Sequence, residues 1–341
     1  MTSLLRRRAV MAAALAVGTA GAMTFPRRAG HADALAFQRD TTGLRPSPAR
    51  IVVPFAAGGT SDILARVVAD ILSARLGTPF TIENRADTAG TFSAEIVAKS
   101  APDGSTLLLG TLGTAVTNQY LQKYLPYDSA ESFAPVALVG EMANVLVVHP
   151  DFPARTLPEF VDRCKALGPR RVGYSSSGPG SAGHLAMEYL QGRAGLKLVH
   201  VDRPSRMRVL DLLSGRVMVA MDSLPAYLKH IRSGALRALA VSSANRWFAA
   251  PDIPTVAEQG LGAFDATQWW YVAVPAGTRR DLVAELSGEI VAGLKLRSAV
   301  LRIRAVGVQE RPGTSEDLCL HIAAENMKWK KVIASAGLVP Q

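Results

Sequence analysis

The sequence predicts an α/β protein of two lobes, each a mostly parallel sheet flanked by helices. Short apolar strands alternate with amphipathic helices along the chain, a pattern typical of right-handed βαβ units. The length of 341 residues is too great for one ordinary core and suits two lobes of roughly 100–150 residues each. Hydrophobic residues make up 48% of the chain and charged residues 19%, which is typical of a globular protein.

The first lobe opens with a short buried strand at 50–55, a turn at 56–62 and a helix that continues to Leu76. Gly77 ends that helix as a left-handed cap. Residues 112–117 are expected to form a loop that leads into a helix. The other elements expected in this part of the chain are strands at 80–84, 106–109 and 145–148 and a helix at 93–100.

A second series of strands and helices follows His149-Pro150. Its expected helices lie at about 157–167, 182–191 and 206–214, and its expected strands at 171–174, 197–201, 217–220 and 236–241. The strand at 269–274 is expected to return to the first lobe, followed by helices at 278–296 and 314–336. The expected division is therefore residues 48–147 plus 269–341 for lobe one and residues 148–268 for lobe two.

Residues 1–36 have the features of an export signal. Arg6 to Arg8 form a basic start, Ala9–Phe25 is apolar, and small-x-small cleavage sites follow within 32–36. The paired arginines also permit a twin-arginine route. The alternative is an uncut apolar helix that anchors the protein. Residues 37–47 would be a short tether, and no later segment reaches the ~20 apolar residues of a membrane span.

The net charge indicates the class of ligand, and the cysteines and histidines bear on disulfides and metal sites. The formal net charge of +10, part of which belongs to the signal, suits an anionic ligand. No dense stripe of basic and aromatic residues points to nucleic acid. Cys164 and Cys319 are expected in helices of different lobes, and therefore to be free thiols. No His/Cys cluster has metal-ligand spacing, and no metal or cofactor is expected.

Three loops that follow strands carry the candidate binding residues. A helix N-terminus offers unpaired N–H groups and a positive dipole end, glycine admits close approach, and hydroxyls add donors. Such loops lie beyond the carboxyl ends of strands, where ligands bind in open α/β sheets. The candidates are Phe55, Ala57, Gly58, Gly59, Thr60 and Asp62 in the first loop, Ser176, Gly178, Gly180, Ser181 and His184 in the second, and Thr111 and Thr114 in the third.

Each loop taken singly also fits a tight turn with a helix cap. Thr60 and Ser181 are ordinary N-cap residues, and Asp62 is favourable in a first helical turn. Because Asp62 would repel a carboxylate, it would instead hold water, orient the loop or meet an ammonium group. His184 is more typical of a satisfied hydrogen-bond partner than of a catalytic base.

Enzyme motifs are missing from these loops. Gly58-Gly59-Thr60 lacks the Gly-Lys-Ser/Thr ending of a phosphate-binding loop, and no G-x-G-x-x-G opens the first βαβ unit. The segment Gly173–Ser177 lacks the final glycine of a nucleophile elbow. The sequence therefore predicts a binding protein with no catalytic residues.

Many short stretches match one known family in the right order. They include 53–62 (VPFAAGGTSD), 83–85 (ENR), 101–104 (APDG), 109–111 (LGT), 126–128 (PYD), 178–181 (GPGS), 222–225 (DSLP), 254–258 (PTVAE) and 275–278 (PAGT). On these residues the chain resembles the periplasmic solute receptors of tripartite tricarboxylate transporters, the Bug receptors. The resemblance covers about residues 48–341.

The resemblance implies a two-lobed Venus-flytrap fold in which strand-to-helix loops hold a ligand carboxylate. It implies a periplasmic receptor, expected to be a monomer, that delivers a small carboxylate to the membrane subunits of such a transporter. The alternative function is a subunit that reports a carboxylate to a membrane signalling protein.

Three segments depart from the family pattern: Ala86–Gly90 replaces a glycine-rich turn, Asp202–Ser205 replaces a Pro-Tyr-Lys-Gly segment, and Tyr271 replaces a glycine. Arg203 brings a fixed charge to a strand-to-helix loop, which suggests a ligand with a second carboxylate. The alternative is a surface arginine paired with Asp202 or Asp222. Asp222 itself is a candidate ligand contact.

Overall fold

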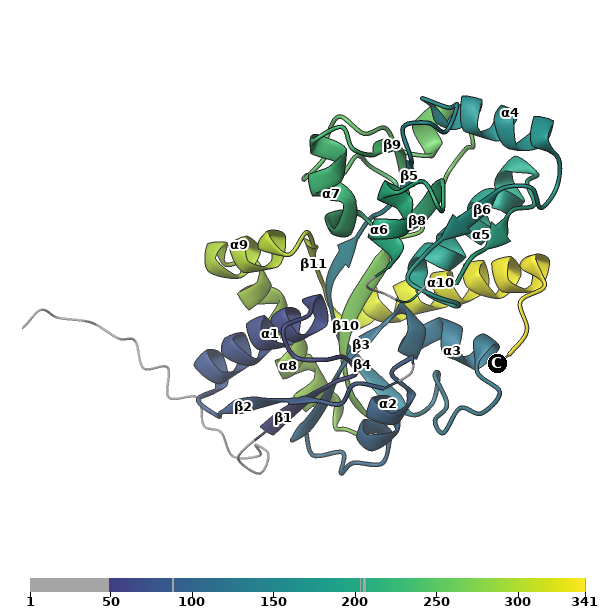
Figure 1. Cartoon of the computed structure of the whole chain (residues 1–341). Helices are drawn as coiled ribbons and strands as arrows, with labels where there is room; N and C mark the ends of the chain where they lie inside the picture. Colours follow the sequence, from purple (N-terminus) through teal and green to yellow (C-terminus); the bar gives the residue numbers. More distant parts are fainter. Residues whose placement is uncertain (1–48, 88, 203, 205–206, 341) are drawn as a thin grey trace, which may run out of the picture. The chain divides into compact units, whose positions relative to one another are not determined.

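The computed structural model describes residues 49–340 except 88, 203, 205 and 206. The predicted export signal, the tether and Arg203 lie outside the described residues. The described chain contains two β-sheets with helices on both faces of each (Figure 1). The α/β class is thereby confirmed.

The first sheet has the strand order β11-β4-β10-β3-β1-β2. Its parallel half is formed by β1, β2 and β3, while β10, β4 and β11 pair in antiparallel fashion. The bounds are β1 Ala49–Val53, β2 Phe80–Asn84, β3 Thr106–Thr111, β4 Phe133–Met142, β10 Gln268–Pro275 and β11 Gln309–Gly313.

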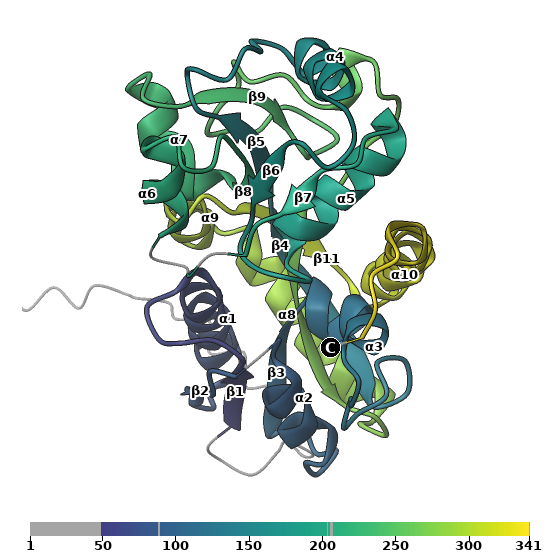
Figure 2. The same cartoon turned by 45° about the vertical axis from the view of Figure 1, so that its right-hand side comes forward.

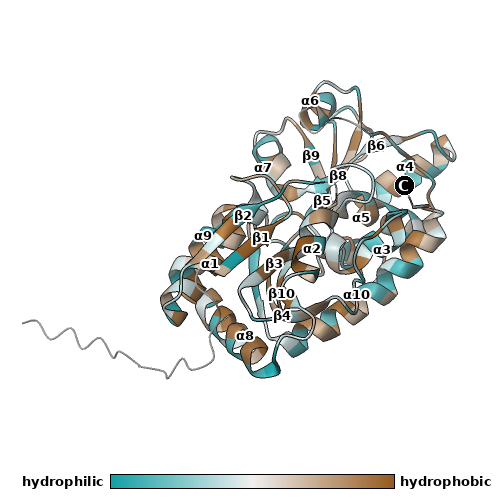
Figure 3. Ribbon diagram, turned by 90° about the horizontal axis from the view of Figure 1, so that it is seen from below, coloured by the Kyte–Doolittle hydropathy of each residue, from teal (hydrophilic) through white to brown (hydrophobic). Residues whose placement is uncertain are grey.

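Two sets of helices cover this sheet because its strands are apolar on both faces. One face, which includes Ile51 and Leu109, packs against α1 (Thr60–Leu76), α8 (Arg280–Leu294) and α9 (Arg297–Ala305). The opposite face, with Val52 and Leu108, packs against α2 (Thr91–Ala98), the π-helical turn η1 (Gly113–Thr117) and α10 (Ser315–Ala336). Hydrophobic and hydrophilic residues alternate around α8 and α10, as expected of such flanking helices (Figure 3).

The second sheet has the order β7-β6-β8-β5-β9. Its core on one face joins α4 (Leu157–Leu167) and α5 (Ala182–Ala194), and on the other α6 (Arg208–Leu213) and α7 (Leu224–Arg232). The strand bounds are β5 Asn144–Val148, β6 Gly173–Ser175, β7 Val199–His200, β8 Val219–Ser223 and β9 Arg237–Val241.

Strands β4 and β5 connect the two sheets with only Ala143 between them (Figure 2). On α10, Trp329 is fully buried and meets the Tyr189 ring of α5 edge-on at 6.3 Å between centroids. A helix that flanks the first sheet thus also packs against a helix of the second.

The expectation of mostly parallel sheets is wrong. In both sheets the strands that lie next to the connection, β4 and β10 in the first and β5 in the second, pair antiparallel with their neighbours. A chain that leaves one sheet and returns to it must reverse its direction in the shared strands. Since β5 lies wholly in the second sheet, we propose that lobe two begins at Asn144 rather than at residue 148.

Several helices and strands were not predicted, because their local sequences are atypical of such elements. Strand β4 contains Pro135 and Gly140, which are unusual within strands, and β11 is polar and contains Pro312. Helices α3 (Asn118–Leu121), α7 and α9 are short. The segment expected to be a loop at 112–117 is largely the helical turn η1.

Candidate ligand-binding site

The predicted loops lie at the carboxyl ends of neighbouring parallel strands. Residues 54–59 follow β1 and residues 112–114 follow β3, and these two strands pair in parallel. In the second sheet, residues 176–181 follow β6, which is parallel to β8. The two loops of the first sheet therefore share one edge, and the loop of the second sheet lies at the corresponding end of its strand, where open α/β sheets bind ligands.

A buried carboxylate shapes the first loop. The Asp62 side chain accepts the Gly58 N–H at 3.0 Å and two bonds from the Arg66 guanidinium, at 2.9 and 3.2 Å. Burial opposes ionisation of Asp62, but the bonds from Arg66 and Gly58 outweigh it and hold the pKa below its usual value. Asp62 therefore orients the loop, one of the roles suggested by the sequence, and Arg66 balances its charge.

Helix α1 presents an open N-terminus. Gly59, in an extended conformation, is the N-cap, so the assignment of Thr60 as the cap is wrong. In the described part of the chain, no acceptor bonds the amides of Thr60 and Ser61. The preceding residues, Phe55 to Gly59, are all exposed. These amides and the helix dipole can receive an anion.

The third loop is held by its own hydroxyl. Thr114 Oγ1 accepts the Thr111 N–H at 2.9 Å, donates to the Thr111 carbonyl at 3.0 Å and lies 3.3 Å from the Tyr271 hydroxyl. Both threonines are buried. Thr114 thus stabilises the turn, and Tyr271, which departs from the family pattern, lies beneath it.

The turn that precedes α2 is fixed by side chains. Asp87 accepts the amides of Phe92 and Ser93 and so caps α2. The Ala89 carbonyl accepts Nδ2 of Asn118 at 2.8 Å. The sequence does not reveal this role of Asn118, because its partner lies 29 residues away.

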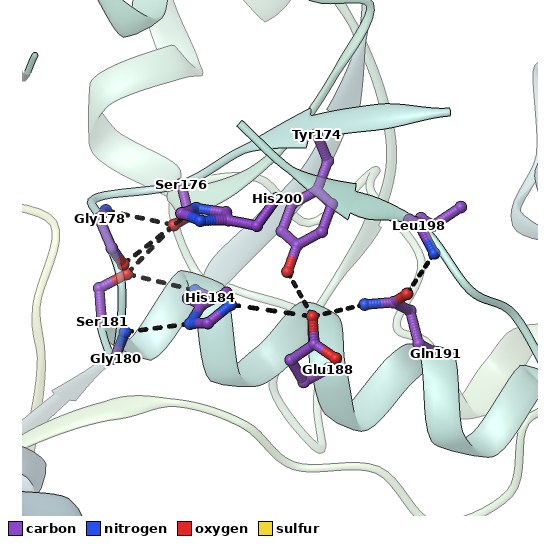
Figure 4. Close-up of polar contacts among 10 residues, drawn as sticks. All are labelled: Tyr174, Ser176, Gly178, Gly180, Ser181, His184, Glu188, Gln191, Leu198 and His200. Atoms are coloured by element: carbon purple, nitrogen blue, oxygen red, sulfur yellow. Dashed lines mark hydrogen bonds and ion pairs between the residues drawn. The ribbon is translucent and has the colours of Figure 1, made fainter. Parts of the chain in front are cut away.

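A hydrogen-bond network organises the second loop (Figure 4). Ser181 is the N-cap of α5, as predicted, and accepts the His184 N–H at 3.2 Å. His184 Nδ1 accepts the Gly180 N–H at 3.0 Å. Ser176 Oγ lies 2.8 Å from His200 Nε2 and also accepts the Gly178 N–H at 3.2 Å. Both imidazoles therefore fix the backbone of this loop.

The environment of His184 keeps it neutral. Burial, followed by the charge of His200, whose ring centroid lies 4.3 Å away, lowers the pKa of His184 to about 4. Since Nδ1 accepts a hydrogen bond, the proton resides on Nε2, which lies 3.8 Å from Glu188. His184 is a satisfied hydrogen-bond partner, the alternative that the sequence favoured.

Asp222 lies against the second loop but is enclosed. Its carboxylate accepts the Ser177 hydroxyl and, at 2.8 Å, the Ser223 N–H. The Arg208 guanidinium lies 3.5 Å from its other oxygen, and the Asp222 side chain is only 4% exposed. The sequence does not reveal this role of Arg208, since no pattern within its short helix relates it to a loop 32 residues earlier.

One cavity brings the two sheets' loops together. It has a volume of about 210 Å³ and is lined by Ala89, Asn118, Leu121, Gln122, Pro179, Gly180, His184 and Gly337–Val339. Of the predicted residues, Gly180 and His184 line it. The cavity lining does not include the first loop, Thr111, Thr114, Ser176, Gly178, Ser181 or Asp222. A Cβ on Gly180 would lie 3.1 Å from Leu121, so the second loop directly adjoins the helix that follows the third.

The described residues lack two further features. Between residues 49 and 340, apart from the gaps, no cluster of three or more His, Cys, Asp or Glu side chains has the geometry of a metal site. Within the same residues, no helix combines the length and apolar character needed to span a bilayer.

The two sheets, each with a glycine- and hydroxyl-rich loop at the carboxyl end of a parallel strand, form the fold of a two-lobed solute-binding protein. The sequence matches the model of the tripartite tricarboxylate transporter family receptor over residues 64–338, and the chain belongs to this family. It is 35% identical over 292 residues to Protein BugT of Bordetella pertussis, with 85% of this chain and 89% of that protein covered.

Solved structures agree with the fold. Rpa4515 of R. palustris, solved with adipate, is 34% identical with a TM-score of 0.74, covering 86% of this chain and 98% of that one. MatC of Rhodopseudomonas palustris, solved with bound malate, is 29% identical with a TM-score of 0.69, covering 84% and 98%. The predicted family and the two-lobed fold are confirmed.

Proposed function

We propose that this receptor captures a small carboxylate-bearing molecule between the loop edges of its two sheets and delivers it to the membrane subunits of a tripartite tricarboxylate transporter. The open N-terminus of α1 carries the proposal: its amides are free to bond an anion, and Arg66 balances the charge of the Asp62 carboxylate. The adipate and malate bound to its relatives are both dicarboxylates.

The proposed contacts are the backbone of 57–60, the turn at Thr111–Thr114 and the second loop at 176–181. Thr114, Asp62 and His184 would hold these loops in shape rather than touch the ligand. For Arg203 we retain the proposal of a contact to a second carboxylate. The test is a panel of mono- and dicarboxylates against wild type and Arg203→Tyr, in which dianions should lose more affinity than monoanions. Equal losses would rule out that role.

The binding function is tested on exported protein purified without refolding. Native mass spectrometry should reveal a co-purified carboxylic acid, and calorimetry with that acid should show one site. Failure of every mono-, di- and tricarboxylate tested to bind would contradict the proposal. Delivery is tested by uptake of the same acid into cells that hold the membrane subunits, with and without this chain.

Export to the periplasm by the signal at 1–36 is part of the same proposal. The expected mature N-terminus lies just after one of the small-x-small sites at 32–36. N-terminal sequencing of the protein released from the periplasm checks this, and an intact Met1 would favour the membrane-anchored alternative.

A further inference from the structure

The ion pair between Arg208 and Asp222 borders the second loop, one of the proposed ligand contacts. Ser177 of that loop donates its hydroxyl to Asp222, and Arg208 Nη1 donates to the Ser176 carbonyl at 3.2 Å. A Cβ on Gly183 would lie 3.1 Å from the Asp222 Cα, so the first turn of α5 packs directly on this residue. The pair and the loop thus form one unit.

The two oxygens of Asp222 are occupied differently. Oδ1 accepts the Ser177 hydroxyl and the Ser223 amide. Oδ2 faces Arg208 Nη1 at 3.5 Å and the Tyr227 hydroxyl at 3.5 Å. Arg208 is the more accessible partner, with 17% of its side chain exposed against 4% for Asp222. A solute that approaches the pair would therefore meet the guanidinium more readily than the carboxylate.

This arrangement has a chemical consequence for the ligand. A carboxylate beside an anion-accepting loop would attract an ammonium group on the carbon next to the bound acid. With Arg208 in place, the negative charge of Asp222 is balanced by the guanidinium. An approaching ammonium group then meets a fixed positive charge instead.

We propose that Arg208 is a specificity-determining residue that, by covering Asp222, selects carboxylates without an amine over their 2-amino counterparts. The inference rests on the proposed carboxylate binding and names the class of carboxylate. It differs from the sequence-based role of Asp222 as a direct ligand contact, because Asp222 here acts through Arg208.

The test compares matched ligands by calorimetry. Succinate, glutarate and adipate are each titrated beside the corresponding 2-amino diacid, with wild type, Arg208→Ala, and the double variant Arg208→Ala/Asp222→Asn. Wild type should prefer the amine-free member of the pair that it binds. In Arg208→Ala that preference should shrink by about tenfold to a hundredfold, the effect of one charge-assisted bond gained by the amine. The double variant has no carboxylate at residue 222, so the 2-amino diacid should not gain affinity in it.

Controls separate this effect from a loss of charge or of fold. Arg216→Ala removes an arginine that pairs with Asp211, away from the second loop, and should keep the wild-type preference. If Arg208→Ala does not fold, Arg208→Gln retains a donor for the Ser176 carbonyl without the charge and should shift the preference in the same direction. An unchanged preference in the folded Arg208 variant would overturn this inference alone, whereas a wild type that binds no carboxylate would overturn the proposed function and this inference with it.

Discussion

Gly110 of β3 and Tyr271 of β10 face each other across the first sheet, and the absence of a side chain on one makes room for the ring of the other. A Cβ at residue 110 would lie 2.3 Å from two carbons of the Tyr271 ring. The Tyr271 hydroxyl lies 3.3 Å from Thr114 Oγ1, so the pair supports the third loop from below.

We expect Gly110→Ala to destabilise the protein by at least about 1–3 kcal/mol, the usual cost of overpacking a core. Denaturant unfolding measures this loss. Gly113→Ala is the matched control, because its nearest contact, at 3.4 Å, is the side-chain oxygen of Asn118. Adding Tyr271→Ala to Gly110→Ala should restore part of the lost stability, because the smaller side chain removes the clash. If the two substitutions prove additive, the two residues do not oppose each other as described.

Gly59→Val should weaken carboxylate binding by roughly a hundredfold, because bonds to a charged ligand are worth about 1.5–3 kcal/mol each and two would be blocked. The fold should survive, since Gly59 has an extended backbone and a Cβ there would meet only the Ala56 carbonyl, at 3.5 Å. Calorimetry measures the affinity and thermal unfolding checks the fold. A folded variant with wild-type affinity would remove the first loop from the site.

Acid should destabilise the protein through His184. Well above pH 6.5 the imidazole is neutral in both folded and unfolded states, and its contribution is fully present. As the pH falls through 6.5 toward 4, His184 becomes protonated in the unfolded chain but stays neutral in the folded chain. The free energy of unfolding therefore decreases by up to about 3 kcal/mol.

Urea unfolding of wild type and His184→Asn across pH 4–7.5 isolates this contribution from that of other histidines. The asparagine oxygen can accept the Gly180 N–H in place of Nδ1 but does not titrate. Its stability should therefore fall less steeply with acid. Parallel pH profiles for the two proteins would show that His184 is not the titrating group.

Both cysteines should be free, as the sequence predicted and the structure shows. Cys164 is buried in α4, where burial raises the pKa of its thiol to about 11, while Cys319 is exposed on α10. A thiol reagent should therefore label Cys319 in the native protein and both residues after denaturation without reductant. Cys319→Ser should leave almost no native labelling. A count of zero in the denatured protein would reveal a disulfide.

The sequence by itself determined the order of most strands and helices, since apolar periodicity reports which residues face a core. It also located the three loops, because glycine, serine and threonine after a strand are needed wherever a backbone turns closely into a helix. The cap at Ser181 was predicted on the same local grounds, whereas the free cysteines were predicted from the lobe to which each helix was assigned.

Tertiary structure alone decided how the strands pair and which charges meet. The antiparallel halves of both sheets arise because the chain crosses between sheets and returns, which no local pattern records. The partners Arg208 and Asp222, Asn118 and Ala89, and Gly110 and Tyr271 are separated by 14 to 161 residues, and their contacts depend on how whole elements pack. The sequence specifies which side chains carry charge. Whether one charge balances another depends on the distance between them, and only the fold sets that distance.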